Sequence, residues 1–168
     1  MAWTKTKTAV VAGVVLILAA GTTTVIVKHP NHHSRSQLQW TPAEKQLFEA
    51  KTTERVNQVK ISVMACSRFA DAHQNQWPTT FAQLNAQFPE CHLSDSNWEF
   101  VSGGNRNSFT NPVQTILFRE KESRQSPDDT FVKVYAFADW SVQKLISPDD
   151  DFAALEKQRG YLIQPAKN

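Results

Sequence analysis

The stretch FVKVYAFA at residues 131–138 decides how this chain folds. Both its even and its odd positions are apolar, apart from Lys133, so a strand formed here would be covered on both faces. Such a strand is expected at the centre of a sheet rather than at its edge. The segments before and after it must therefore supply neighbouring strands and the helices that cover them.

Three shorter segments are predicted to be the neighbouring strands. They lie at 98–101, 115–119 and 141–145 and are bounded by turn-forming or charged residues. A turn is predicted at 103–105, where two glycines precede an asparagine, and the polar segment 121–129 is predicted to be a loop. This succession of short strands indicates a small antiparallel sheet.

A long helix is predicted to begin at Thr41. Its hydroxyl can accept from a free backbone N–H, Pro42 suits the first turn, and Glu44 can reach back to the cap. Apolar or small side chains then recur every three or four residues, which places on one face Val56, Val59, Val63, Cys66, Ala70 and His73. We expect this face to pack on the sheet, the alternative being a coiled-coil seam between copies.

Two shorter helices are expected after the break at 75–78. The first is capped by Thr80 with Gln83 and ends before Pro89. The second is predicted at 149–159, after an acidic cap that suits the positive end of a helix dipole. The fold class is therefore α+β, with a long helix packed on a small antiparallel sheet and a C-terminal helix.

An apolar run from Thr8 to Val27 carries no charge and follows Lys5 and Lys7. A helix of about 20 residues crosses about 30 Å of hydrocarbon, so this run is predicted to be an N-terminal transmembrane helix. The lysines favour an inside N-terminus, which predicts a single pass through the inner, cytoplasmic membrane with the C-terminal domain outside. Cleavage as a signal peptide near Gly21 is the alternative.

The predicted membrane anchor divides the chain into three parts. Residues 1–28 form the membrane anchor, 29–40 a polar linker and 41–168 one globular domain. The formal net charge of +2 is spread over interspersed acidic and basic residues, which is not the pattern of a nucleic-acid-binding protein. Neither a phosphate-binding glycine loop nor a nucleophile or metalloprotease motif occurs, so we do not expect an enzyme.

Two sets of side chains are candidates for covalent or metal chemistry. Cys66 and Cys91 are compatible with one disulfide in an oxidising compartment, or with two buried free thiols. Acidic pairs are candidates for calcium binding, with a turn and a helix cap as the alternative roles; they are Asp128, Asp129, Asp149 and Asp150. No other cofactor is expected.

Three stretches carry a resemblance to a known family. They are VNQVK at 56–60, FADAHQNQWPT at 69–79, which ends the long helix in an aromatic-proline step, and VYAFADWSV at 134–142. Together with the order of elements, they resemble type II secretion pseudopilins and type IV pilin-like proteins, in particular the pilin-like domains of planctomycetes and verrucomicrobia. Those domains have Ala-Asp-Gly-His-Val where this chain has Trp140 and Ser141 in place of the glycine and histidine. The prepilin processing site of the family is also lacking.

The resemblance implies a role in protein interaction. The chain would be a membrane-anchored extracytoplasmic module whose partners are proteins of the cell envelope, in a secretion or pilus-like apparatus or as a scaffold. A second hypothesis is a sensing or regulatory module of a sigma-factor-associated signalling system. A third is a secreted binding protein or enzyme released by signal cleavage.

Overall fold

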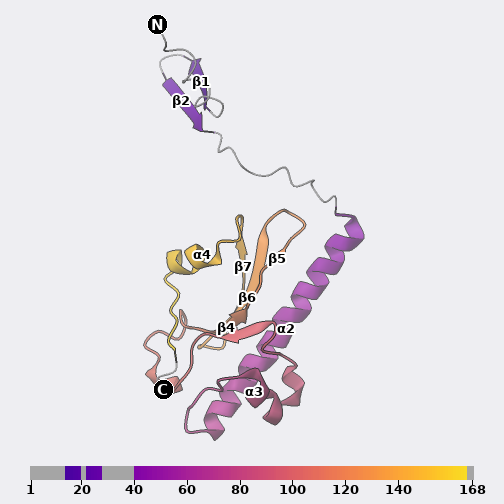
Figure 1. Ribbon diagram of the computed structural model, residues 1–168, viewed down its shortest axis with the longest axis vertical. Coiled ribbons are helices and arrows are strands. Elements are labelled where there is room, and N and C mark those ends of the chain that lie inside the picture. Colours follow the sequence, from indigo (N-terminus) through magenta and orange to yellow (C-terminus); the bar gives the residue numbers. More distant parts are fainter. Residues whose placement is uncertain (1–13, 20–21, 28–39, 166–168) are drawn as a thin grey trace. The chain divides into compact units, whose positions relative to one another are not determined.

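The computed structural model describes residues 14–19, 22–27 and 40–165 (Figure 1). The chain divides into two units, Met1–Gln39 and Trp40–Asn168. In the first unit, β1 (Val14–Ala19) pairs antiparallel with β2 (Thr22–Val27). None of the helices in the described residues is both long and apolar enough to cross a bilayer.

The transmembrane helix expected from Thr8 to Val27 stays a prediction, because only part of this run is described. The described part forms two strands, and the rest of the run, like the linker up to residue 39, lies outside the described residues. The physical reason is local: valine, threonine and isoleucine dominate this run, and β-branched side chains favour the strand conformation.

The long helix α2 (Pro42–Ala72) begins where the capping signal predicts. The Glu44 backbone N–H donates to Thr41 Oγ1 at 3.2 Å, and the Thr41 N–H donates to Glu44 Oε2 at 2.7 Å. This reciprocal pair satisfies two donors that a helix start otherwise leaves free. The helix ends just before Gln74 and Asn75, which both adopt positive φ angles.

The predicted apolar face of α2 is confirmed as the face packed on the sheet. Val59, Cys66 and Ala70 have no exposed surface, and Val63 is also buried. They join sheet residues such as Phe118 and Val134 in one hydrophobic cluster. Because this face is filled within the chain, the alternative coiled-coil seam along it is wrong.

One antiparallel sheet organises the second unit, as Figure 1 shows. Its strands are β3 (Trp98–Phe100), β4 (Ile116–Glu120), β5 (Arg124–Gln125), β6 (Phe131–Phe137) and β7 (Val142–Ser147). β7 pairs with β6 along residues 131–136, so β4 and β5 must share the other edge of β6. The prediction that 131–138 forms the central strand is confirmed.

The segment 121–129 was predicted to be a loop, but it contains the short strand β5. Arg124 pairs with Val132 and Gln125 with Phe131, which extends the pairing of β6 beyond the end of β4. A two-residue strand of polar side chains has no apolar alternation to reveal it. It forms because β6 presents unpaired backbone groups there.

Helices cover both faces of the sheet. α2, α3 (Phe81–Gln87) and the 3₁₀ turn η1 (Pro89–Cys91) pack on one face through the cluster that contains Val134 and Ala136. α4 (Phe152–Gln158) packs on the other, where its Phe152 joins Tyr135 and Phe137. Alternate residues of β6 thus serve opposite layers. The second unit is α+β, with a long helix and a small antiparallel sheet.

The C-terminal helix begins at Phe152 rather than at Asp149. Asp151 is its N-cap and accepts from the Ala154 backbone N–H at 2.9 Å. Asp150 has a φ of 65°, which lies outside the right-handed helical region. Helical geometry therefore starts only after this residue.

Candidate functional site

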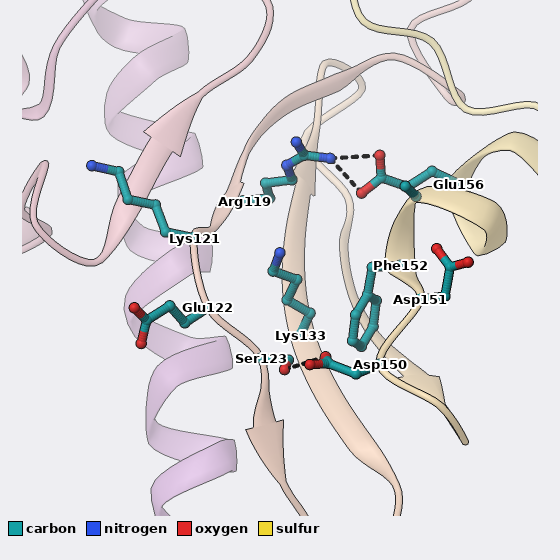
Figure 2. A pocket seen from close by; sticks show the side chains of 10 residues that line it. Arg119, Lys121, Glu122, Ser123, Lys133, Asp150, Asp151, Phe152 and Glu156 are labelled. Atoms are coloured by element: carbon teal, nitrogen blue, oxygen red, sulfur yellow. Dashed lines mark hydrogen bonds and ion pairs between the residues drawn. The ribbon is translucent and has the colours of Figure 1, made fainter. Parts of the chain in front are cut away.

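A cavity of about 560 Å³ lies where the end of β4, the middle of β6 and the start of α4 meet (Figure 2). Its wall combines basic and acidic side chains with one aromatic ring. The lining residues include Arg119, Ser123, Lys133, Asp150, Phe152 and Glu156.

An ion-pair network holds one wall of this cavity. Arg119 Nε donates to Glu99 Oε1 at 2.7 Å, and Arg119 Nη1 donates to both carboxylate oxygens of Glu156. The Tyr135 hydroxyl donates to Glu156 Oε1 at 2.7 Å. Burial, and then the neighbouring Glu156 carboxylate, raise the pKa of Tyr135 above its usual value, so this hydroxyl keeps its proton. The network ties α4 to β4 and β6.

Lys133 projects into the middle of the cavity (Figure 2). Its Nζ lies 5.5 Å from the centroid of the Phe152 ring. Burial, and then the nearby Arg119 charge, lower the pKa of Lys133, while the carboxylates of Glu156, Glu99 and Asp150 oppose that shift. The amine thus has both acidic and basic neighbours. This arrangement suits a structural role better than the recognition of one strongly charged ligand.

The four aspartates proposed for calcium lie in the turn between β5 and β6 or in the segment between β7 and α4. The Asp128 N–H donates to Ser126 Oγ, and Asp129 occupies a positive-φ position in the turn between β5 and β6. Asp149 accepts from the Ser147 hydroxyl at 2.8 Å, which lowers the pKa of Asp149. Asp150 accepts from the Ser123 hydroxyl.

The two acidic pairs lie at the same end of the sheet, because Phe131 stands opposite Ser147. Even so, no group of three acidic, histidine or cysteine side chains within the described residues is arranged to hold a metal ion. Asp128 and Asp129 lie in a turn, whereas the N-cap of α4 is Asp151 rather than Asp149 or Asp150, and calcium binding at the four aspartates stays a prediction.

Cys66 and Cys91 lie in the same hydrophobic cluster, and neither has exposed surface. Both are free thiols in this structure. Burial, and then the neighbouring Cys91, raise the pKa of Cys66 well above its usual value. The structure thus brings together two residues that the sequence could only name as a possible pair.

An exposed apolar stripe on α2 was not anticipated from the sequence. Leu47 is 53% exposed, Ile61 45% and Met64 58%. At 100° per residue these three side chains fall within about 100° of one another. Ile61 and Met64 lie one turn apart, whereas Leu47 lies about 21 Å from Ile61 along the axis, at the angular position of the buried Ala65. Their spacing of 14 and 3 residues was the available signal, but Glu54 and Asn57 lie between them and interrupt it.

Trp140 is a second exposed apolar residue in an unusual setting. It is 54% exposed, whereas Trp77 and Trp98 are buried. It occupies the turn between β6 and β7 with a φ of 70°, a region that glycine enters far more easily. This chain thus makes a turn of positive φ with tryptophan, in which Asp139 Oδ1 accepts from the Ser141 N–H and hydroxyl.

No protein-family model matches this sequence, and no curated protein or solved structure matches it either.

Proposed function

We propose that this chain is a membrane-anchored interaction module outside the cytoplasm, resembling a pseudopilin, which binds an envelope protein through the exposed stripe of α2. The observation that carries the proposal is this stripe, formed by Leu47, Ile61 and Met64, each about half exposed. Exposed apolar side chains that recur along one helix offer contact positions to a partner helix.

The length of α2 supports this interpretation. The helix has 31 residues, but between residues 41 and 51 every side chain is exposed except the half-buried Phe48. An isolated solvent-exposed helical segment gains little from propensity alone, since most helix stability in proteins comes from packing. A partner helix laid along this segment would supply the missing packing.

The chemistry of the stripe also indicates the kind of contact. Glu54 and Asn57 share the stripe with the apolar residues, so the buried area would be modest and the affinity in free solution weak. Tethering both partners to one membrane raises their effective concentration and compensates for a weak contact. We therefore infer that the partner is a helix of another membrane-anchored protein, and the apolar run from Thr8 to Val27 is the proposed tether.

Membrane topology tests the anchor and the compartment. We expect a reporter fused after Asn168 to be active only outside the cytoplasm, and the full-length chain to stay in the membrane fraction without shortening. The control is a variant in which Val14 and Leu16 are replaced by arginine, which should release the chain from the membrane because charges are costly in hydrocarbon. A cytoplasmic reporter, or a shortened soluble product, would contradict the proposal.

Photo-crosslinking tests the stripe itself. A photoreactive side chain placed at Leu47 or at Ile61 in the full-length chain is expected to give a discrete protein adduct in membranes. The matched control is Glu49, which is exposed but lies two residues, or about 200°, around the helix from Leu47. Ile61→Glu should abolish the adduct formed from position 47 while changing the free energy of unfolding by less than about 0.5 kcal/mol. Equal adducts from positions 47 and 49 would refute a contact through the stripe.

A further inference from the structure

We propose that Cys66 and Cys91 become a disulfide bond when the domain folds outside the cytoplasm, which covalently joins α2 to η1. The compartment in this statement rests on the proposed function, since structural disulfides form and persist in oxidising environments. The juxtaposition of the two residues does not depend on it.

The placement of Cys91 against α2 is the first argument. α2 and η1 pack directly against each other, and the Ser62 hydroxyl donates to the Cys91 carbonyl oxygen at 3.3 Å. Ser62 lies one helical turn before Cys66, on the same buried face. The backbone of Cys91 therefore sits over the turn of α2 that precedes Cys66.

The direction of the Cys66 side chain is the second argument. Cα–Cβ bonds in an α-helix tilt toward the helix N-terminus, so the Cys66 side chain leans back toward Ser62 and thus toward Cys91. Both side chains are fully buried in one hydrophobic cluster. The Cys66 thiol is thus directed toward the neighbouring segment that carries Cys91, and a disulfide needs such proximity.

The reaction is an exchange with a disulfide donor. A thiolate of one cysteine attacks the disulfide of a thiol–disulfide oxidoreductase and forms a mixed disulfide, which releases one thiol of the donor. The second cysteine then attacks the sulfur of the first cysteine in that mixed disulfide. This step forms the Cys66–Cys91 bond and releases the other thiol of the donor. The donor gains two electrons and two protons, and the protein loses them. Because both thiols are buried in the folded domain, this exchange takes place while the chain folds.

The bond would hold η1, and with it the segment that contains α3, against α2. It would close a loop from residue 66 to residue 91 that contains the break after α2 and the whole of α3. Closing this loop lowers the conformational entropy of the unfolded chain. The unfolded state then becomes less favourable, which stabilises the folded state. Burial would also protect the bond from reductants in solution.

Refolding of the purified full-length chain decides this inference. The chain is reduced, unfolded in urea and refolded in a buffer of reduced and oxidised glutathione, and its free thiols are then counted by alkylation under denaturing conditions and intact mass. We expect none in the refolded protein, and a cross-linked peptide containing both cysteines after proteolysis. The oxidised form should melt about 10 °C above the reduced form. Two free thiols after refolding would overturn the inference.

Single serine variants provide the controls. Cys66→Ser and Cys91→Ser should each keep one thiol, and their melting temperatures should not respond to reductant. The same response in the variants as in the natural sequence would also overturn the inference, because the shift would then arise elsewhere. Refolding in glutathione does not involve the membrane, so a cytoplasmic reporter in the topology experiment would refute the proposed function without altering this result.

Discussion

Replacing Phe118 by alanine is expected to lower the free energy of unfolding by about 4 kcal/mol. The Phe118 side chain has no exposed surface, and its ring meets those of Phe81, Trp98 and Phe100 at centroid distances of 5.2, 6.2 and 5.3 Å, in edge-to-face arrangements. These rings belong to α3 and β3, so the variant loses contacts that join both elements to β4. Each aromatic pair contributes about 0.5–1.5 kcal/mol beyond its buried area.

Urea unfolding followed by tryptophan fluorescence measures this loss, since Trp98 lies beside the altered site. Phe118→Leu is the matched control: it keeps most of the volume and should cost less than about 1.5 kcal/mol. A loss below about 1 kcal/mol for the alanine variant would mean that the four rings do not form the centre of the core on the α2 side of the sheet. Because domains are stable by only about 5–15 kcal/mol, the expected loss is a large part of the total.

Replacing Glu120 by glutamine is expected to cost about 3 kcal/mol, the second largest effect. The Glu120 side chain is 2% exposed and Oε1 accepts from Arg55 Nη1 at 2.7 Å, with Arg124 Nε at 3.5 Å. Without the negative charge, two arginines stay close together with no counter-charge. The figure is at the low end for a broken buried pair because Arg55 is 38% exposed and water can partly solvate it.

The position of Glu120 explains why its charge is buried at all. Oε2 accepts from the Val134 backbone N–H at 2.8 Å, in the interval of β6 between its pairings with β4 and with β5. The carboxylate thus replaces a missing strand partner and joins α2 to the sheet through Arg55. An unsatisfied backbone N–H at this depth would cost about 1–3 kcal/mol.

The matched control is Glu122→Gln, two residues along the chain, where the side chain is exposed. We expect it to change the free energy of unfolding by less than about 0.5 kcal/mol, because it removes the same charge without uncovering a buried partner. Similar losses for the two variants, measured by urea unfolding in the same buffer, would show that the Glu120 network contributes nothing specific.

Several elements could be predicted because their determinants are local. The Thr41–Glu44 and Thr80–Gln83 caps act within four residues and both form as expected, with Thr80 Oγ1 accepting from the Gln83 N–H at 3.1 Å. The spacing of apolar residues likewise predicts the buried helix face around Val59 and the central strand at 131–137. Periodicity carries this information because each element must turn one side toward the core.

Neither the candidate site nor the buried Arg55–Glu120 ion pair could be predicted in the same way. The Arg55–Glu120 pair joins residues 65 positions apart, and the Arg119–Glu156 pair joins residues 37 positions apart. Nothing local distinguishes these charges from those on a solvated surface. The exposed stripe on α2 was missed for a related reason: whether Ile61 or Met64 faces solvent depends on which helix face the sheet covers.

The sequence by itself determined the α+β class, the caps, the long helix with its buried face, and the central strand. Only the tertiary structure decided that β5 adds to the edge of β6, that α4 covers the opposite face of the sheet, and that Cys66 lies against η1. The first group depends on capping hydrogen bonds and hydrophobic periodicity, which act within one element. The second depends on which buried surfaces and backbone groups of distant segments satisfy one another, and that is settled only when the whole chain packs.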